Sequence, residues 1–281
     1  MIKAFREYMI GEKKSMNTIN AYCSDIQQMN NYINKPDDKI GYDDLLNWKS
    51  SISSLASSTV HRKIAAVEKY FDFLIDTDVI TINPAAKIKN VKIKNKEKLP
   101  LNEDEIKAML EVCSNKRQKA MVYMLGATGL RISELTGLTI EQYKNRINNK
   151  IIVNGKGDKD NVININQKIA EIVDDYIDDM RSAYPAMANS KYLFPSFKGN
   201  QMATCSFDAS LKSIAKRAGI ANWQSVSAHT FRHSFATILL NNNVGIDVIQ
   251  TLMNHSNIQT TRRYAKTNEN RLIAAVNTIN I

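Results

Sequence analysis

The sequence is poor in cysteine, glycine and proline, with 3, 10 and 5 of them among 281 residues. The three cysteines, at positions 23, 113 and 205, form no CxxC pair, so neither a structural zinc site nor a disulfide framework is expected. The scarcity of Gly and Pro argues against long flexible linkers. Hydrophobic residues make up 43% and charged residues 23% of the chain, which is typical of a globular protein and not of a disordered or fibrous one.

Long apolar runs are also missing. The longest mostly apolar stretch, residues 120–130, is shorter than the roughly 20 residues that a membrane-spanning helix needs. The first fourteen residues mix charged and apolar side chains and contain no continuous apolar segment of the kind found in signal peptides. We therefore expect a cytoplasmic protein that does not associate with membranes.

Several common catalytic motifs are absent. The chain has no GxxxxGK[ST], HExxH or GxSxG segment, and Gly155-Lys156-Gly157 lacks the third glycine of a dinucleotide-binding fingerprint. His229 and His233 are four residues apart, a spacing that could hold a metal, but no third ligand is near and Arg232 between them would repel a cation. The sequence argues against nucleotide hydrolysis and metalloprotease chemistry, and we expect neither a cofactor nor a bound metal.

What the chain does have is positive charge. It contains 38 Lys and Arg against 28 Asp and Glu, a net charge of +10, with a pI near 9.3. Such a charge suits a polyanion, most commonly nucleic acid, although it could also serve solubility alone. Residues 86–98 concentrate six lysines against one acid: Lys87, Lys89, Lys92, Lys94, Lys96 and Lys98. This segment is expected to be extended, either as a solvated tether or as a strap along DNA phosphates.

The apolar pattern predicts helices on both sides of this segment. Before it we expect a short opening helix, a helix capped by Ser15, and helices over 42–48 and 57–75, the last with apolar residues at spacings of three and four. The prediction is a helical DNA-binding domain over 1–85, a linker over 86–98 and a catalytic domain over 99–281.

The region after residue 98 mixes helices with one hairpin. Asn102 and Glu105 have the layout of a capping box, followed by helices to about residue 112 and over 116–130. β-branched runs at 151–153 and 162–165 flank Asn154-Gly155-Lys156-Gly157-Asp158 and predict an antiparallel pair. Helices follow at 167–183, 206–218, 228–241, 245–253, 257–265 and 268–279. The expected fold class is mostly α, with two domains and a small antiparallel sheet in a mixed α+β second domain.

A scattered set of basic residues and one tyrosine remains to carry chemistry. In chain order they are Arg131, Lys156, His229, Arg232, His255 and Tyr264. Arg131 stands where a helix restarts after Gly129, Lys156 lies at the hairpin tip, and His229 and Arg232 share one helical face. Each residue alone has an ordinary explanation as a surface, capping or packing group, so the indication comes from the set and its order.

With these segments in view, the chain resembles the tyrosine recombinases of the phage integrase family over nearly its whole length. The matching segments are ATGLRISEL around Arg131, Gly155-Lys156-Gly157, AHTFRHSFAT at 228–237, LMNHS at 252–256 and TRRY at 261–264. The helical first half resembles the family's core DNA-binding domain. One departure is Asn254, where the family often has Gly, which affects a helix end and no catalytic group.

The resemblance implies a chemistry that fits these residue types. Tyr264 would attack a DNA phosphodiester and form a covalent 3′-phosphotyrosyl bond, so that rejoining needs no ATP. Arg131 and Arg232 would neutralise the non-bridging oxygens, and Lys156 would protonate the leaving 5′ oxygen. His229 would take part in proton transfer and His255 would bind the phosphate. His233 and Glu134 are expected to be structural, and His61 to be ordinary surface.

The family also implies an assembly: a homotetramer on two double-stranded DNA sites, a Holliday junction intermediate, and a tail after Tyr264 that docks on a neighbouring protomer. Two alternatives stay open on the sequence. A topoisomerase IB-like nicking and relaxing enzyme shares the chemistry and would relax plasmids without a specific site. A catalytically silent DNA-binding regulator would form no covalent adduct.

Overall fold

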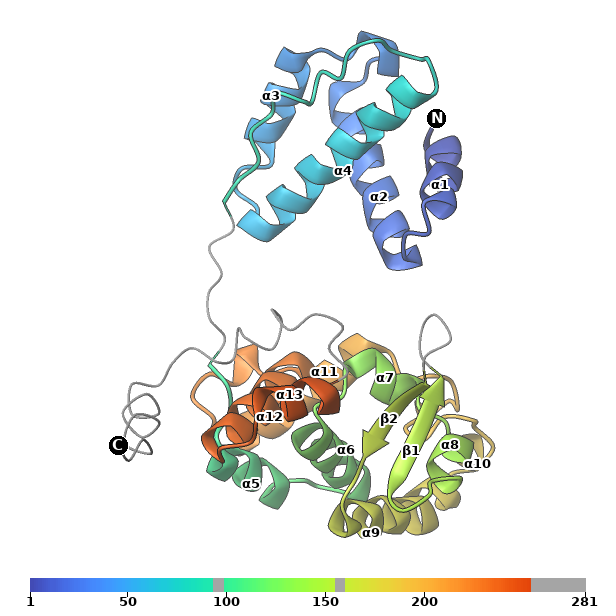
Figure 1. Ribbon diagram of the computed structural model, residues 1–281, viewed down its shortest axis with the longest axis vertical. Helices are drawn as coiled ribbons and strands as arrows, with labels where there is room; N and C mark the ends of the chain where they lie inside the picture. The colour runs from blue at the N-terminus through green and yellow to red at the C-terminus, as the bar shows by residue number, and fades with distance from the viewer. Residues whose placement is uncertain (93–98, 155–159, 254–281) are drawn as a thin grey trace, which may run out of the picture. The chain divides into compact units, whose positions relative to one another are not determined.

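The computed structural model divides the chain into two compact units, Met1–Glu97 and Lys98–Ile281 (Figure 1). It describes residues 1–92, 99–154 and 160–253. Each unit has its own hydrophobic core, and the regular structure is helical apart from one pair of antiparallel strands. The predicted fold class, mostly α with two domains and a small antiparallel sheet, is confirmed. Within the described ranges, no helix combines the length and apolar character that a membrane span needs.

The first unit is built from four α-helices: α1 (Ile2–Gly11), α2 (Met16–Ile33), α3 (Tyr42–Ser51) and α4 (Ser57–Asp76). The predicted cap of α2 is present, since Ser15 Oγ accepts the backbone N–H of Thr18 at 3.2 Å. The helix ends where Asn34 adopts a left-handed conformation, with φ of 50°. Asn tolerates this region better than most residues, which is why the chain can turn there.

Helix α4 contributes more residues to the core of this unit than any of the other three helices. All six residues of its predicted apolar stripe are buried: Val60, Ile64, Val67, Tyr70, Phe71 and Leu74. Phe5 of α1 packs edge-on against Tyr70, with 5.2 Å between ring centroids. Burying a large apolar side chain contributes about 1.5–3 kcal/mol, so this one helix accounts for much of what holds the unit together.

A buried charge cluster joins α2 to α4. Asp25 and Lys63 are 2% and 5% exposed, and Lys63 Nζ donates to Asp25 Oδ1 at 3.0 Å and to Gln28 Oε1 at 2.6 Å. Arg62 donates to the other oxygen of Asp25. Removing one partner of such a cluster leaves a buried charge uncompensated, which typically costs about 3–5 kcal/mol. Lys63 therefore serves the fold and is not available to a phosphate.

The start of the lysine-rich segment differs from the prediction of a linker beginning at residue 86. Ile88 and Val91 pack against the core of the first unit, Lys49 Nζ donates to the carbonyl of Lys89 at 2.7 Å, and Asn90 donates to the carbonyl of His61 at 3.2 Å. Residues 86–92 therefore lie on the first unit. The physical reason is that two apolar residues three apart anchor the chain despite its lysines. Lys94, Lys96 and Lys98 lie outside the described residues.

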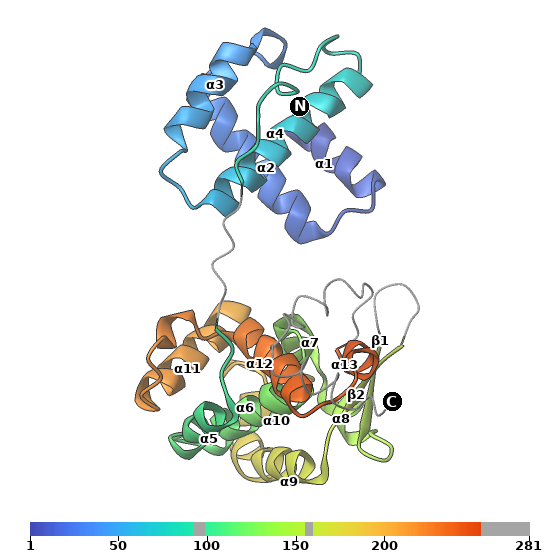
Figure 2. The same ribbon diagram turned by 60° about the vertical axis from the view of Figure 1, so that its left-hand side comes forward.

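The second unit is arranged around α6 (Lys116–Thr128), which is buried on nearly all sides and contacts α5, α9 and α12 (Figures 1 and 2). A helix that is apolar all round is expected to be central. The helices of this unit besides α6 include α5 (Glu103–Glu111), α7 (Ile132–Gly137), α8 (Ile140–Lys144), α9 (Gln167–Asp175), α10 (Pro185–Ala188), α11 (Thr204–Arg217), α12 (Ala228–Asn241) and α13 (Ile246–Leu252). The predicted capping box of Asn102 and Glu105 is present at the start of α5.

The predicted hairpin is confirmed as the strands β1 (Lys150–Asn154) and β2 (Asp160–Asn164), which pair antiparallel with Ile151 opposite Ile163. Ile151 and Ile163 are buried, whereas Ile152 and Val162, which form the next pair along, are exposed. This alternation follows the two-residue period of a strand with one face on the core. The connecting residues 155–159 lie outside the described structure.

The helix predicted over 167–183 changes its hydrogen-bond pattern midway. It begins as α9 (Gln167–Asp175) and continues as a π-helical stretch, Tyr176–Arg181. Arg181 is buried and donates to the carbonyls of Ala188, Ser190 and Tyr192. The π-helical stretch leads directly into this arginine, which fastens the irregular segment after α10 to the core.

Candidate active site

Arg131 is placed by the ends of two helices. Helix α6 ends at Gly129, which has a left-handed φ of 61°, and α7 begins immediately after Arg131, its N-cap residue. The guanidinium of Arg131 is 44% exposed, and its Nη1 donates to Glu134 Oε1 at 2.8 Å. The other carboxylate oxygen of Glu134 accepts the backbone N–H of Arg131, also at 2.8 Å. One carboxylate thus holds both the backbone and the side chain of this arginine.

His229 and Arg232 lie on α12, whose bounds match the predicted 228–241. The helix begins with a capping box between Ser227 and Thr230, and its first N–H, that of Ala228, also donates to Asp208 at 2.9 Å. His229 lies in the first turn with its side chain exposed, and Arg232 lies one turn further on and is 4% exposed. His229 is thus accessible for proton transfer, and Arg232, one turn further along the helix, is a buried cation.

Arg232 connects three segments that each belong to a different motif. Its Nη1 donates to the carbonyl of Gly129 and its Nη2 to the carbonyl of Met253, both at 2.6 Å. Gly129 is two residues before Arg131, and Met253 is two residues before His255 in the sequence. Both carbonyls belong to residues that end a helix, α6 and α13. Carbonyls at helix C-termini lack intrahelical partners and carry partial negative charge, so a guanidinium is a suitable donor for them.

The structure therefore places the guanidinium of Arg232 against the ends of α6 and α13, two residues from Arg131 along the chain, and places His229 one turn earlier on α12. Lys156, His255 and Tyr264 lie outside the described residues, as do both helices predicted beyond residue 256. The described structure places the segments that lead into them, since β1 ends two residues before Lys156 and α13 ends three residues before His255. The positions of these three side chains stay predictions.

Two contacts at this site were not predicted from the sequence. Glu134 was expected to be a structural partner of its own helix, which its capping-box bond to the N–H of Arg131 confirms, and its carboxylate also holds the guanidinium of Arg131. The signal available was the spacing of three residues between Arg131 and Glu134, which is that of a capping box. Gly129 was noted only as a helix end, whereas its carbonyl also binds Arg232. Sequence spacing cannot reveal a contact between residues 103 positions apart.

Two other buried arginines show how the site differs from ordinary structural positions. Arg117 and Arg181 are each 5% exposed, and both donate to backbone carbonyls in or beside the segment from α10 to Met202. Burial lowers the pKa of the guanidinium in each of them. The ring of Phe197 lies 5.0 Å from the guanidinium carbon of Arg117. These two arginines hold a loop, whereas Arg232 joins segments that carry the predicted catalytic residues.

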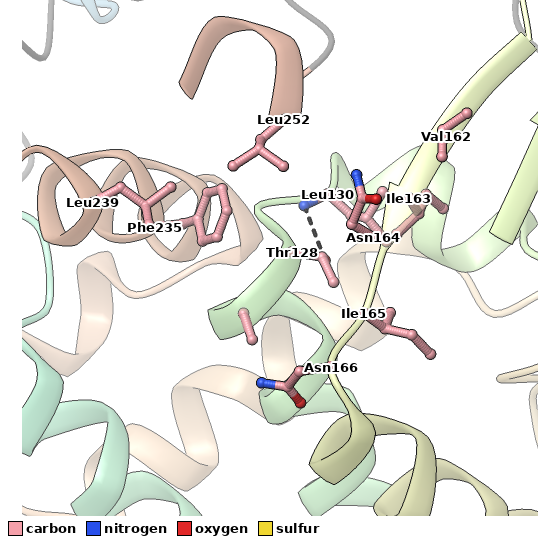
Figure 3. A pocket seen from close by; sticks show the side chains of 11 residues that line it. Thr128, Leu130, Val162, Ile163, Asn164, Ile165, Asn166, Phe235, Leu239 and Leu252 are labelled. Atoms are coloured by element: carbon pink, nitrogen blue, oxygen red, sulfur yellow. Dashed lines mark hydrogen bonds between the residues drawn. The ribbon is translucent and has the colours of Figure 1, made fainter. Parts of the chain in front are cut away.

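An apolar cavity of about 300 Å³ lies beside the site, between α12, α13 and β2 (Figure 3). Figure 3 shows Phe235 and Leu252 pointing into it from α12 and α13, with Leu130 and β2 on the other side. Its walls are Ala127, Thr128, Leu130, Val162, Ile163, Asn164, Ile165, Asn166, Phe235, Leu239 and Leu252. The cavity therefore adjoins Gly129, the residue whose carbonyl binds Arg232.

No group of three or more His, Cys, Asp or Glu side chains that could hold a metal occurs among the residues that the structure describes. The described side chains of the candidate site are the guanidinium groups of Arg131 and Arg232 and the imidazole of His229. Guanidinium groups supply planar donors that match the oxygens of a phosphate.

Models of known families match both parts of the chain. The model of the phage integrase family matches residues 100–271, and the model of the phage integrase N-terminal SAM-like domain matches residues 2–78. The tyrosine recombinase XerD of Rickettsia bellii (strain RML369-C) is 33% identical over 98% of this chain and 96% of its own. The crystal structure of the XerA recombinase is 26% identical, with a TM-score of 0.55 over 99% of this chain and 96% of its own.

A further structure shares the fold. The XerH site-specific recombinase bound to its difH substrate in a pre-cleavage complex has a TM-score of 0.72 and 24% identity, over 92% of this chain and 78% of its own. The catalytic-domain match alone covers more than half of the chain, and it spans every residue that the sequence singled out for catalysis. The chain belongs to the phage integrase family and is a tyrosine recombinase.

Proposed function

We propose that this protein acts in the cytoplasm on paired double-stranded DNA sites, cutting and rejoining strands through a 3′-phosphotyrosyl bond to Tyr264 and a Holliday junction. The observation that carries the proposal is the position of Arg232. Its guanidinium binds the carbonyls of Gly129 and Met253, which lie two residues before Arg131 and two residues before His255. The segments that contain Arg131, Arg232 and His255 are thereby joined at one guanidinium. Residues that act on the same phosphate must lie close together, so this arrangement supports the proposal.

The described arginines suit the charge that develops during cleavage. As Tyr264 attacks, negative charge builds up on the non-bridging oxygens of the phosphate. The bonds from Nη1 and Nη2 to two carbonyls fix the orientation of the Arg232 guanidinium. Positioned donors of this kind are typically worth about 3–4 kcal/mol each on a developing oxyanion. Arg131, fixed by Glu134, is proposed as the second such donor.

Proton transfers are assigned to the remaining motif residues. His229, exposed in the first turn of α12, is proposed to take part in proton transfer with Tyr264. His255 is proposed to donate a hydrogen bond to the phosphate, and Lys156 to protonate the leaving 5′ oxygen. Because the phosphotyrosyl bond keeps the energy of the phosphodiester, attack by a 5′ hydroxyl reverses the reaction and no ATP is consumed.

The exposed lysines of residues 86–92 are proposed to bind DNA phosphates. Lys87, Lys89 and Lys92 are exposed while Ile88 and Val91 hold the segment against the first unit, so the lysines are presented from a fixed backbone. Lys94, Lys96 and Lys98 are proposed to continue the contacts. Fixed cations release DNA counterions without the entropy cost of ordering a free tether, which favours binding.

Replacing Lys87, Lys89 and Lys92 by Gln should weaken binding to all DNA sequences alike. Each lost phosphate contact lowers the slope of log affinity against log salt by about 0.9, so the three together should lower it by roughly 3. The matched control replaces three exposed lysines elsewhere on the first unit, Lys3, Lys13 and Lys39. The measurement is a salt titration of binding, and equal slopes for the two triple variants would contradict the contacts.

Recombination between two sites requires several protomers, and we propose that a homotetramer forms with the tail after Tyr264 docked on a neighbour. Residues 268–279 have an apolar stripe that would be costly to leave in water. We propose the cavity between α12, α13 and β2 as the receiving surface, because its walls are mainly apolar. The proposed role is resolution or integration of DNA, in line with relatives named XerD.

Ending the chain after Thr267 should spare binding to a single site and lower recombination at least about tenfold, the effect of losing about 1.4 kcal/mol of docking free energy. Leu239→Asp in the full chain should act in the same way, because it puts a carboxylate into the cavity wall. Val248→Asp, on the exposed face of α13, is the control. The measurement counts Holliday junctions and recombinants on paired sites. Normal recombination by the shortened chain would rule out tail docking.

A further inference from the structure

Gly129 combines three features at the end of α6, and catalysis as proposed above leaves it without a role. The first is its backbone conformation. Its φ is 61°, in the left-handed region, and its N–H donates to the carbonyl of Leu125 at 3.2 Å, which closes α6. Residues with a side chain rarely adopt this conformation, whereas glycine adopts it without penalty. The turn it makes brings Arg131, two residues later, to the start of α7.

The second feature is a close approach by α12. A Cβ placed on Gly129 would lie 2.4 Å from Cδ1 of Phe235 and 3.0 Å from its Cγ. Phe235 lies on α12 one turn after Arg232, is 8% exposed, and forms part of the cavity wall in Figure 3. Any side chain at position 129 would therefore push the ring, and with it this part of α12, away from the end of α6.

The third feature is the carbonyl of Gly129, which accepts from Nη1 of Arg232 at 2.6 Å. The same guanidinium reaches the carbonyl of Met253 at the end of α13. The direction of the Gly129 carbonyl depends on the left-handed turn, and its distance from Arg232 depends on how closely α12 approaches. The left-handed turn at Gly129, the close approach of α12 and the hydrogen bond to Arg232 therefore all affect where the guanidinium groups of Arg131 and Arg232 lie.

We propose that Gly129 is a positioning residue that fixes the guanidinium of Arg232 relative to that of Arg131, so that both reach one phosphate. The inference rests on the proposed roles of these two arginines. A side chain at 129 would separate α12 from the end of α6 by a fraction of an ångström to about 1 Å, and misplacements of this size can lower a rate by about 10²-fold.

The test compares Gly129→Ala with Gly219→Ala. Gly219 also has a left-handed φ, 73°, at the end of α11, but a Cβ there would meet nothing within 4 Å. Both variants carry similar backbone strain, which should lower the melting temperature by roughly 2–4 °C, and Gly129→Ala should lose more because it also carries the clash with Phe235. Gly129→Ala should form the covalent DNA adduct about 10²-fold more slowly than the unmodified protein, and Gly219→Ala within about threefold of it. DNA affinity should stay within a few fold for both.

A second substrate separates positioning from general damage. A methylphosphonate at the cleaved position replaces one non-bridging oxygen by a methyl group and removes the negative charge, so less cation is needed in the transition state. The defect of Gly129→Ala should shrink to less than about tenfold on this substrate, because it acts through the arginines. A defect of equal size on both substrates would show that Gly129 only supports the fold.

The outcomes distinguish this inference from the function on which it rests. If Arg131→Ala and Arg232→Ala cleave at the normal rate, the proposed function fails. If those variants are slow while Gly129→Ala matches Gly219→Ala, only the positioning role fails. Should Gly129→Ala not fold, the comparison is repeated in a Phe235→Ala background, where the added methyl has room. There the clash is gone, so the double variant should cleave within about threefold of Phe235→Ala, and a defect of about tenfold or more would show that the close approach of α12 is not what position 129 controls.

Discussion

Tyr264→Phe should form no detectable covalent complex with DNA while binding its site within a few fold of the unmodified protein. The substitution removes one oxygen, the proposed nucleophile, and keeps the ring. No other group can form the phosphotyrosyl bond in its place, so the expected effect is loss of cleavage and not a partial defect. The measurement traps the complex on DNA carrying a nick near the cleavage position, so that religation is prevented. An adduct formed by this variant would contradict the assignment.

The other tyrosines provide controls for this experiment. Tyr143 and Tyr176 are buried, and their hydroxyl groups donate to Asp174 and to the carbonyl of Leu193, respectively. Burial raises the pKa of both, that of Tyr176 to about 12, so their phenolates are scarce near neutral pH. Tyr184 is 47% exposed and has no catalytic role in this account. Tyr184→Phe should therefore cleave at the normal rate.

Lys156→Ala should slow cleavage of ordinary DNA by about 10²–10⁴-fold with binding nearly intact. The leaving 5′ alkoxide is strongly basic and needs a proton in the transition state, and a positioned general acid typically gives this factor. The flanking strands β1 and β2 support the role, since Lys156 lies in the connection between them while the arginines lie on or beside helices. We propose that it approaches the bridging oxygen from a different direction than the arginines do.

A DNA substrate with sulfur in place of the bridging 5′ oxygen distinguishes the proposed role of Lys156 from that of Arg131. The leaving group is then a thiolate, whose conjugate acid has a pKa of roughly 8.5, and it departs without an acid. Lys156→Ala should recover most of its cleavage rate on this substrate. Arg131→Ala should not recover, because it stabilises charge on the non-bridging oxygens. Rescue of the arginine variant without rescue of the lysine variant would show that the roles are reversed.

Local signals in the sequence were enough to predict most of the helices and the hairpin. The Ser15 cap, the capping box of Asn102 and the bounds of α12 were predicted from residue types and spacing, and the structure has all three. These features depend on neighbours three or four residues apart, which the sequence displays directly. The π-helical stretch at Tyr176–Arg181 was not predicted, because it accompanies distant contacts of Arg181.

The lysine-rich segment shows where composition misleads. Its many lysines indicated an extended linker from residue 86, but Ile88 and Val91 hold residues 86–92 on the first unit. Two apolar side chains decide the position of the backbone, while the lysines between them remain exposed. A count of charges describes the surface that a segment presents and does not show whether its backbone is anchored.

The site was predicted as a set of residues but not as a set of contacts. Arg232 was recognised by its motif, whereas Arg117 and Arg181, equally buried, bind the carbonyls of a loop, and nothing in the composition of the chain separates the three. The bonds from Arg232 to Gly129 and Met253 span 103 and 21 residues. Contacts of this length depend on the packing of α6, α12 and α13, which only the folded structure shows.

The most direct test of the central claim is to identify the atom that holds the DNA. Complexes of the full chain trapped on nicked DNA are digested with protease, and the peptide that carries a nucleotide is sequenced by mass spectrometry. The DNA recovered with the complexes is sequenced in parallel. The account predicts a 3′-phosphate on the peptide containing Tyr264 and a common sequence at the cleavage position. Attachment to another residue, or DNA joined through its 5′ end, would contradict it.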